Sequence, residues 1–398
     1  MVGVTGSDLP RGDGDAGGPS YLDALEGVVD RELAAAATAP SPRATHAEVA
    51  RTLAEVEDAV ARSPHDCFDF ANDGRATLRA GGRTHAAGRF RLEAIGDLRR
   101  RLTHADGALR FSVLLGAAAV TDIGALQAAA TPGVMFQVAS QFNCLEAPEP
   151  CIVPVRDYVW DYTQGPRASV SAFPGTLLRH YLAPSIQTKS ADAASKEGPF
   201  TQTDERQIDL LADAFGRDVA AVRHGYLTSD AIANPPRLAA LLEERFERIR
   251  IGVHDDIEVV FGHDLGGPVP RGARQRIAQA LTSTLALGGY SAESSGPALA
   301  AIRRQLLRAA YLGTVLAALD LRKHAVVLTC IGGGVFGNPH EAIWDAILWA
   351  LDEAQPLAPA PLHVVLNARG LSSSVSRDDI RRAVAARGGV FADGEGRS

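Results

Sequence analysis

The most restrictive feature of this 398-residue sequence is a run of three glycines that directly follows an apolar segment. The segment Ala325–Ile331 is too apolar to lie at a surface, which predicts a buried strand. Gly332, Gly333 and Gly334 allow the backbone to turn sharply after it and to expose several amides. Pro339 is well placed for the first turn of a following helix. The sequence therefore predicts a buried strand, a glycine loop and a helix, in that order.

The same alternation of apolar strands and amphipathic helices continues through the rest of the chain. Apolar or alternating segments predict strands at 109–119, 134–139, 249–261, 324–331 and 362–366. The spacing of apolar residues predicts helices at 273–287, 298–319, 340–351 and 377–387. This order is typical of a three-layer α/β fold with a mixed, largely parallel sheet. In such folds ligands bind at the carboxyl ends of the strands.

Composition and spacing divide the chain into four regions. Residues 1–20 are rich in Gly, Asp and Pro, which predicts a disordered tail. Residues 21–108 predict a helical extension that also carries short strands. Residues 109–370 form the expected α/β core, with an inserted and partly helical segment at about 184–244. Residues 371–398 predict a last helix and a tail.

Charge, cysteine content and hydropathy exclude several classes of partner and location. The formal net charge is -7 and no long Lys/Arg run is present, which argues against binding to a DNA duplex. The cysteines form no CxxC pair and no His cluster has zinc-ligand spacing, so no metal site is expected. Cys144 and Cys330 lie in apolar runs and are expected to be small buried hydrophobes. Without a signal-peptide pattern or a bilayer-spanning apolar run, we expect a cytoplasmic protein with no membrane association, or one exported without a cleavable signal.

The loop from Gly332 to Asn338 has the properties of an anion-binding site. Backbone N–H groups at the start of a helix attract an anion, and the helix dipole adds to this attraction. A phosphate is the most natural anion, and the amides of Gly333 to Gly337 are its expected seat. The loop lacks the Lys-Ser/Thr ending of a Walker A sequence and is not a GxGxxG after a first strand. The alternative is a tight turn without a ligand, but three glycines cost backbone entropy that such a turn does not require.

The glycine loop resembles the phosphate loop of macrodomains, which bind ADP-ribose. The matching residues are Gly332, Gly333, Gly334, Val335, Phe336, Gly337, Asn338 and Pro339. In that family an aromatic residue of the loop packs near the distal ribose, and Phe336 occupies this position. The resemblance runs from about Leu109 to Leu366 and implies a macrodomain-like core that binds ADP-ribose.

Two upstream segments resemble other ligand-contacting elements of macrodomains. Asp122 and Ile123 resemble a Gly-Asp-Ile element whose Asp contacts the adenine amino group. Thr163, Gln164 and Gly165 precede a predicted helix and occupy the place of the family's first glycine-rich loop. The usual glycine run is replaced there by Gln-Gly-Pro-Arg. The resemblance thus implies ligand contacts from both segments, on an altered first loop.

A third upstream segment, Phe136–Asn143, is similar to a macrodomain strand that ends in an Asn-Ala-Ala-Asn-like sequence. Its last residues are Gln141, Phe142 and Asn143, and they match that sequence only in part. The large insertion between the two loops is a further departure from the family. The chain is therefore identified as an atypical member of the macrodomain superfamily. It looks similar to bacterial ADP-ribosylhydrolases, including effectors that act on ADP-ribosyl-arginine.

Carboxylates near these segments are the candidate catalytic groups. Cleavage of a sugar–nitrogen bond needs a positioned water and support for the positive charge that develops at the ribose carbon. Asp161, before the Thr-Gln-Gly-Pro turn, is the first candidate, and Asn143 is expected to hold the distal ribose hydroxyls. Asp256 and Glu258 alternate on one predicted strand, so both are expected on one face, where they can bind a substrate guanidinium. Glu146 ranks below them, and surface charge or helix capping is the alternative for each acid.

Three functions are compatible with these motifs. The first is a hydrolase that removes ADP-ribosyl groups from a modified substrate, with arginine-linked ADP-ribose as a candidate. The second is a module that binds ADP-ribose without cleaving it, since the fold supports both. The third is an interaction protein with a vestigial site, against which the intact glycine loop counts. The expected partners are ADP-ribose and an ADP-ribosylated substrate, above all a protein, and no cofactor is expected.

Overall fold

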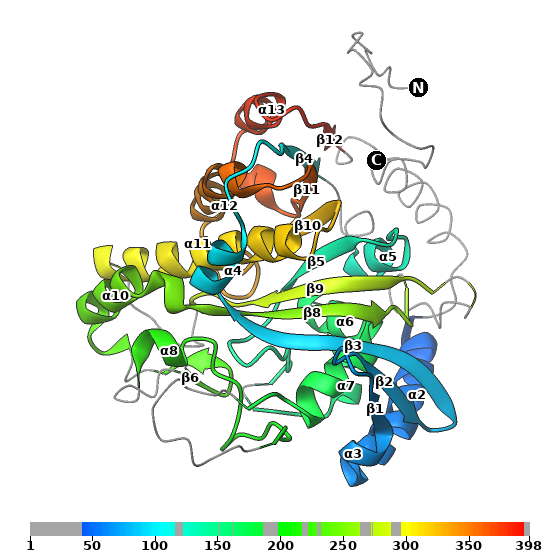
Figure 1. The fold of residues 1–398 in the computed structure, drawn as a ribbon. Coiled ribbons are helices and arrows are strands. Elements are labelled where there is room, and N and C mark those ends of the chain that lie inside the picture. Colours follow the sequence, from blue (N-terminus) through cyan, green and yellow to red (C-terminus); the bar gives the residue numbers. More distant parts are fainter. Residues whose placement is uncertain are drawn as a thin grey trace.

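The computed structural model describes residues 42–115, 122–149, 151–161, 163–185, 198–216, 222–228, 232–262, 272, 274–287 and 296–393. Within them, a ten-stranded mixed sheet lies between two layers of helices (Figure 1). The predicted three-layer α/β class is confirmed. The predicted tail at 1–20, and the part of the helical extension before residue 42, lie outside the described residues.

The sheet has a parallel half and an antiparallel half. The strand order is β1-β2-β3-β8-β9-β5-β10-β11-β4-β12. Along this order, neighbours from β1 to β9 pair antiparallel, and neighbours from β9 to β12 pair in parallel. The strands are β1 (Phe68–Phe70), β2 (Ala76–Ala80), β3 (Arg83–Ala94), β4 (Leu109–Leu115), β5 (Val134–Ala139), β8 (Arg250–Glu258), β9 (Arg276–Thr282), β10 (Ala325–Thr329), β11 (Leu362–Asn367) and β12 (Phe391–Asp393).

Strands β5 and β10 are mostly apolar because both of their faces are covered. In β5, Phe136 and Val138 pack in one hydrophobic cluster, whereas Met135 between them packs in another on the opposite face. Val326 and Val327 of β10 divide between the same two clusters. A strand that is buried on both faces reads as a continuous apolar run, which is the pattern that predicted these strands.

Helices cover both faces of the sheet (Figure 1). On one face α11 contacts β8, β9 and β10, and α12 packs on α11. On the other face α6 contacts β5, and α7 contacts β3 and β8. The helices are α2 (Pro42–Arg62), α3 (Pro64–Cys67), α4 (Ile95–Arg101), α5 (Ile123–Ala128), α6 (Gln164–Ser171), α7 (Phe173–Tyr181), α8 (Ala212–Phe215), α10 (Pro235–Glu244), α11 (Pro297–Asp320), α12 (His340–Ala354) and α13 (Arg377–Ala385).

The predicted helix at 273–287 is wrong, because this segment forms strand β9. Its sequence, Arg-Ile-Ala-Gln-Ala-Leu-Thr, is rich in residues with high helix propensity. The strand pairs with β8 on one side and β5 on the other, and all its residues after Arg276 are buried. Tertiary pairing therefore overrides the local preference. The predicted helices at 298–319, 340–351 and 377–387 are present as α11, α12 and α13.

Strand β3 joins the predicted N-terminal extension to the main sheet. It pairs antiparallel with β8 from Arg89↔Asp255 to Ala94↔Arg250. Helix α2 packs on the other side of this region, against β2, α7 and the 3-10 helix Val155–Trp160. The extension thus shares hydrogen bonds and packing with the rest of the fold.

The described part of the segment at 184–244 carries a short hairpin and two helices. Strands β6 (Val222–Arg223) and β7 (Tyr226–Leu227) form the hairpin, which precedes α10 in the chain. The ring of Tyr226 lies 5.8 Å from the ring of Phe336, measured between centroids. The hairpin is thereby brought against the glycine loop.

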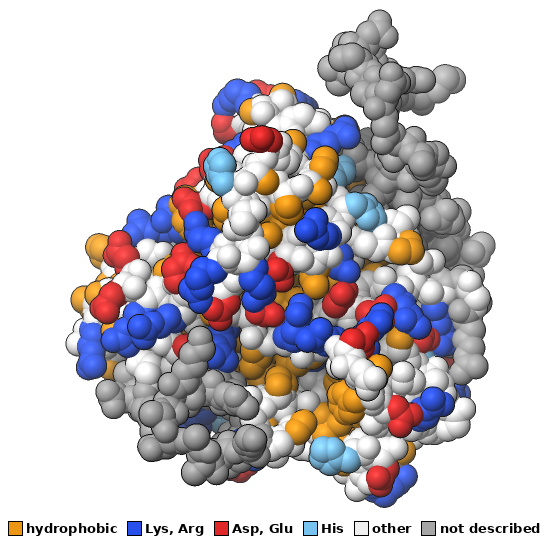
Figure 2. Space-filling model, viewed as in Figure 1, with side chains coloured by type: hydrophobic (Ala, Val, Ile, Leu, Met, Phe, Trp, Pro, Cys, Tyr) orange, Lys and Arg blue, Asp and Glu red, His pale blue; other side chains and the backbone are white. Residues whose placement is uncertain are grey.

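The surface and the helices place limits on two further properties. On the face that Figure 2 shows, Lys and Arg side chains are interspersed with Asp and Glu, so no large field of one sign forms there. Among the described helices, none combines the length and the apolar character that a bilayer crossing requires.

Candidate functional site

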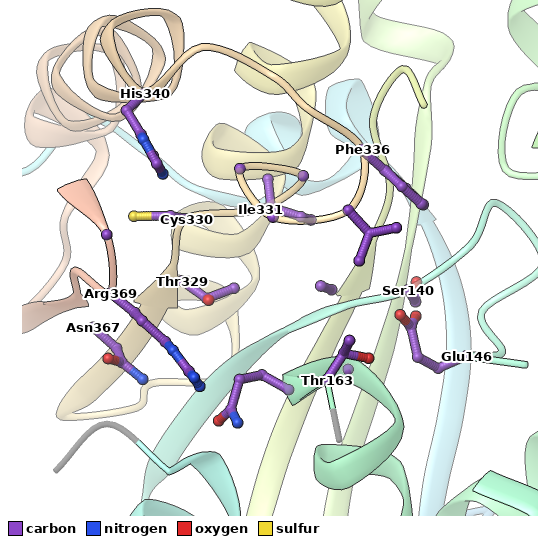
Figure 3. A pocket seen from close by; sticks show the side chains of 18 residues that line it. Ser140, Glu146, Thr163, Thr329, Cys330, Ile331, Phe336, His340, Asn367 and Arg369 are labelled. Carbon is purple, nitrogen blue, oxygen red and sulfur yellow. The ribbon is translucent and has the colours of Figure 1, made fainter. Parts of the chain in front are cut away.

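A cavity of about 440 Å³ opens at the carboxyl ends of β5, β10 and β11 (Figure 3). Helices α6 and α12 both begin at this cavity, so two helix N-termini face it. Eight of the predicted site residues line it: Thr163, Gln164, Gly165, Gly332, Gly333, Gly334, Val335 and Phe336. The structure therefore brings the two predicted loops together across one pocket.

The glycine loop is folded back on itself by backbone hydrogen bonds. Gly333 N donates to Cys330 O (3.0 Å), and Gly337 N donates to Gly334 O (3.0 Å). These two amides already donate within the loop, so fewer of the amides from Gly333 to Gly337 can bind a phosphate. Within the described part of the chain, the amides of Gly334 and Val335 have no such bond. They are the amides that remain to bind an anion in the pocket.

Asn338 stabilises the glycine loop through side-chain hydrogen bonds and does not line the cavity. Its Nδ2 donates to Leu285 O (2.9 Å) and to Gly332 O (3.2 Å). Gly332 has a φ of +70°, and a Cβ there would lie 2.6 Å from this amide nitrogen. Only glycine fits that position. Gly337 and Asn338, predicted ligand contacts, thus shape the loop without lining the cavity.

Asp161 holds the turn before α6. Its Oδ1 accepts hydrogen bonds from Thr163 N (2.7 Å) and from Thr163 Oγ1 (2.6 Å). This is a side-chain turn of the kind that precedes helices. Asp161, the first-ranked catalytic candidate, is not among the residues that line the cavity. Its hydrogen bonds to Thr163 give it a structural role in the turn.

Glu146 is the acid that the structure places in the cavity. It follows β5 and lies against the first turn of α6, where a Cβ on Gly165 would be 2.7 Å from its Cγ. Its Oε2 is buried and has no hydrogen-bond partner among the described residues. Burial raises the pKa of Glu146 well above its ordinary range, and the nearby Asp161 raises it further. A carboxyl with such a pKa stays protonated toward neutral pH and can act as a proton donor.

Asp256 and Glu258 lie near the carboxyl end of β8, an interior strand, and so at the opposite end of the strands from the cavity. Strand β8 runs antiparallel to β9, and Glu258 pairs with Arg276 at the start of β9. The site in Figure 3 is at the other end of the neighbouring parallel strands. A register shift between His254 and Ile257, with Asp256 at φ +64°, also breaks the alternation on which one-face placement depended. These two acids do not belong to the pocket.

Both remote acids have cationic partners of their own. Asp256 Oδ2 is 3.1 Å from Arg276 Nη1, and Glu258 Oε1 is 2.6 Å from Arg274 Nη1. Burial by itself raises the pKa of Glu258, but hydrogen bonds from His85, Arg274 and the backbone of Ala86 outweigh it and lower the pKa to about 2. Glu258 is therefore a partly buried carboxylate held in an ion pair.

The segment after β5 is buried beside the cavity. Asn143 Nδ2 donates to Gln207 Oε1 (3.1 Å), and its Oδ1 accepts from Leu145 N (3.0 Å). Gln141 Nε2 donates to Ala147 O (2.8 Å) and to Tyr226 Oη (3.0 Å). Phe142 packs in the main hydrophobic core. These three residues position the chain that carries Glu146, and none of them lines the cavity.

Asp122 and Ile123 also lie beside the cavity without lining it. The Asp122 carboxylate accepts from Ala125 N (2.9 Å) as the N-cap of α5, and it pairs with Arg167 (3.3 Å). Ile123 N donates to Gln164 Oε1 (2.8 Å), which ties the start of α5 to the start of α6. Asp122 thus caps α5 and pairs with Arg167, and its contact to the adenine stays a prediction.

Several residues that line the cavity were not predicted as ligand contacts. They are Ala139, Ser140, Glu146, Thr329, Cys330, Ile331, His340, Asn367, Arg369 and Gly370. Cys330 was expected to be a buried hydrophobe, but its side chain faces the cavity (Figure 3). Burial raises the pKa of its thiol to about 12, so it is not a thiolate nucleophile at neutral pH.

The lining residues share a position that the sequence shows. Most of them come directly after β5, β10 or β11, and strand ends of this kind hold ligands in open α/β sheets. Applied to β11, this rule would have found Asn367 and Arg369. For Glu146, the apolar neighbours Leu145 and Ala147 are the signal of burial.

No protein-family model matches the sequence, and no curated protein matches it. Among solved structures, the chain is similar to the poly(ADP-ribose) glycohydrolase from Thermomonospora curvata, with 15% identity and a TM-score of 0.39 over 87% of this chain and 99% of that chain. It is also similar to the poly(ADP-ribose) glycohydrolase from Deinococcus radiodurans in complex with ADP-ribose. There the identity is 13% and the TM-score 0.41, over 75% of this chain and 93% of that chain.

Proposed function

We propose that this chain is a hydrolase that binds ADP-ribose through a macrodomain-like core and cleaves a glycosidic bond at the distal ribose, with Glu146 as its acid. The observation that carries the proposal is the position of Glu146. Glu146 is half-buried, its Oε2 is buried without a hydrogen-bond partner in the described chain, and the residue lines the same cavity as the glycine loop. Ionisable groups with strongly perturbed environments cluster at functional sites, which supports a role for Glu146.

The pocket supplies what a diphosphate ligand requires. The amides of Gly334 and Val335 are available on one side, and the N-termini of α6 and α12 add positive potential. The volume of about 440 Å³ lies within the range of small-ligand sites. Phe336 lines the end of the pocket where Glu146 lies, which fits an aromatic contact to the distal ribose (Figure 3).

In this arrangement Glu146 works as a general acid and then as a general base. Its proton is donated to the oxygen or nitrogen that leaves the ribose carbon, so the leaving group departs neutral. The carboxylate that remains accepts a proton from the water that attacks the same carbon. The glycine loop holds the diphosphate during both steps, so that the ribose carbon stays close to the acid.

The positions of Asp256 and Glu258 give no support to an arginine linkage between ADP-ribose and the substrate. Asp256 and Glu258 were expected to bind a substrate guanidinium, but they lie at the opposite end of the strands from the cavity. Arginine-linked ADP-ribose is therefore one test substrate among others. Poly(ADP-ribose) and serine-linked ADP-ribose complete the panel, and all three are offered to the same enzyme preparation.

The decisive experiment replaces Glu146 by Gln and measures binding and turnover separately. We expect the Glu146→Gln variant to bind ADP-ribose within a few-fold of wild type in calorimetry, because shape and size are kept. Its turnover should fall on the order of a thousandfold, the usual loss when a general acid is removed. Glu149→Gln is the matched control, since Glu149 is exposed and outside the cavity.

A module that binds ADP-ribose without cleaving it is the second candidate. Glu146 is the single acid among the described residues that line the cavity, whereas many glycosidases use two carboxylates. Tight binding of ADP-ribose by a wild-type protein that cleaves no linkage of the panel would favour this candidate and refute the hydrolase.

A further inference from the structure

A second cavity, of about 560 Å³, lies where β8 ends and where β5, β9 and β10 begin. These strands are neighbours in the sheet (Figure 1), and the cavity of the glycine loop is at their other end. Three of the described lining residues are acidic, and five are basic: Arg75, Arg89, Arg274, Arg276 and Lys323. The described lining thus carries a formal excess of two positive charges, and we call this cavity the basic pocket.

The basic side chains extend from the interior of the fold to its surface. The side chains of Arg274 and Lys323 are 11% and 13% exposed, and each lies 2.6 Å from an acidic partner. Those of Arg75 and Arg276 are 55% and 58% exposed and belong to the outer part of the pocket. The positive charge is therefore distributed over the depth of the pocket, which suits an anion with more than one charged group.

One carboxylate already lies between two arginines of this pocket. Asp256 Oδ2 is 3.1 Å from Arg276 Nη1 and 3.5 Å from Arg75 Nη1. The register shift in β8, where Asp256 has a φ of +64°, directs the carboxylate there. Two guanidinium groups from distant parts of the chain thus converge on one oxygen atom. The same convergence is what binds an external oxyanion.

Arg89 adds donors that the fold itself does not use. It lies on β3, opposite Asp255 of β8 in the antiparallel register. Asp255 pairs with Lys323 (2.6 Å), and the Arg89 guanidinium makes no hydrogen bond or ion pair with the described residues. A guanidinium presents five N–H donors in a fixed fork, so Arg89 keeps them available for a ligand.

We infer that the basic pocket binds a compact anion with two or more phosphate groups, whose oxygens accept from Arg75, Arg89 and Arg276. The inference does not depend on the proposed function, because the pocket shares no lining residue with the cavity of the glycine loop. Guanidinium groups bind phosphate oxygens through paired hydrogen bonds, which give both affinity and orientation. The volume of about 560 Å³ lies within the range of small-ligand sites.

Calorimetry with inorganic triphosphate, at one pH and one ionic strength, tests this inference. We expect Arg89→Gln and Arg276→Gln each to bind triphosphate about tenfold more weakly than wild type, the size of one hydrogen bond to a charged group. Arg79→Gln is the matched control. Its exposed guanidinium pairs with Asp69 outside the pocket, so this variant should keep the wild-type affinity.

Asp256→Asn distinguishes a ligand site from a purely structural ion-pair cluster. Asn keeps the shape of the side chain and tolerates the left-handed backbone, but it removes the negative charge that competes for two arginines. In a phosphate site the triphosphate affinity should rise severalfold, because a like charge beside the ligand is gone. In a structural cluster the arginines lose their common partner, and the affinity should fall.

Three results would overturn the inference. The first is that triphosphate does not bind, or binds equally to wild type, Arg89→Gln and Arg276→Gln. The second is weaker binding by Asp256→Asn, with thermal unfolding showing that the variant is folded. The third is an affinity that falls in Gly334→Glu and not in Arg89→Gln, since this assigns the anion to the glycine loop.

A parallel titration with ATP identifies the source of the phosphate groups. An ATP affinity equal to that of triphosphate shows that the phosphates alone are recognised, and a tighter one shows that the ligand is a nucleotide. Either result supports the inference when it depends on Arg89 and Arg276.

Discussion

Gly165 and Glu146 are in a contact that leaves no room for a side chain on the helix. A Cβ on Gly165 would overlap the Glu146 carboxyl and would lie 2.7 Å from its Cγ. Gly165 is the second residue of α6, so the start of this helix lies directly against the acid. The missing side chain is what allows Glu146 to sit between α6 and the cavity. The position of the proposed acid therefore depends on a residue of the opposite loop.

Replacement of Gly165 by Ala should displace Glu146 and reduce turnover at least tenfold. Within a helix Ala is favoured over Gly by about 1 kcal/mol, so any loss of stability in this variant would come from the overlap with Glu146. Steady-state hydrolysis and thermal unfolding of Gly165→Ala measure the two effects. Gly198→Ala is the control, since a Cβ at that exposed glycine meets no atom within 4 Å. A Gly165→Ala variant with wild-type turnover would show that the placement of Glu146 is not critical.

The pH dependence of turnover should report the protonation of Glu146. Because burial raises its pKa, the acid form persists toward neutral pH and is lost as the pH rises through that pKa. We expect kcat/KM to fall on the alkaline side with a single proton released. The same raised pKa means that ionised Glu146 opposes folding at high pH, so Glu146→Gln should be no less stable than wild type at pH 8. An alkaline limb that persists unchanged in a slow Glu146→Gln variant would assign it to another group.

The strand, loops and helix starts that surround the cavity could be predicted from the sequence, because each has a local sequence pattern. An apolar strand, Ala325–Thr329, ends in glycines before a helix, and the structure keeps this order. The glycine loop follows the end of a strand, and the other loop precedes the start of a helix. Both lie at the carboxyl ends of the parallel strands, so they meet. Thr163 and Gly333, which are 170 positions apart in the chain, accordingly line one cavity.

The proposed acid could not be chosen from the sequence, because burial and strand direction distinguish the candidate acids. Asp161 is near the site in sequence, but its carboxylate is used by the Thr163 turn. Asp256 was placed by strand alternation, which a bulge interrupts, and β8 runs in the opposite direction to the strands that end at the pocket. The pKa of Glu146, on which its proposed role depends, is raised mainly by burial within the fold. None of these effects can be recognised from the spacing of residues in the sequence.

Gly334 offers a clean test of anion binding by the glycine loop. A Cβ there meets no atom within 4 Å, whereas one on Gly333 would lie 2.9 Å from His340 Nε2 and 3.0 Å from Ile343 Cδ1. Gly334→Glu should therefore fold normally and lose ADP-ribose affinity by a hundredfold or more, on the order of the repulsion between close like charges in a partly buried site. Gly334→Ala, which adds volume without charge, should retain more of the affinity. Calorimetry with ADP-ribose and thermal unfolding of both variants measure affinity and stability. Unchanged affinity in Gly334→Glu would show that the phosphate does not bind at this loop.

Glu258 should contribute to stability and not to catalysis. Its carboxylate is 16% exposed, lies 2.6 Å from Arg274 Nη1, and accepts from Ala86 N at 2.9 Å. Because these bonds lower its pKa to about 2, below the ordinary value of 4.5, the stabilisation is fully present above about pH 5 and is lost as the pH falls toward 2. Glu258→Gln should reduce the unfolding free energy by about 2 kcal/mol at pH 7, and the difference from wild type should shrink as the pH is lowered.

Denaturant unfolding of wild type and Glu258→Gln between pH 7 and pH 3 measures this stabilisation directly. Glu55→Gln is the control, since its ion pair with Arg83 is 3.5 Å long and exposed, and such pairs contribute little. Hydrolysis by Glu258→Gln should match wild type at a temperature where both are folded, because Glu258 lies at the end of β8 away from the cavity. A large loss of turnover in a stably folded Glu258→Gln protein would return this acid to the catalytic candidates. A stability difference that does not vary with pH would show that the ion pair is not its source.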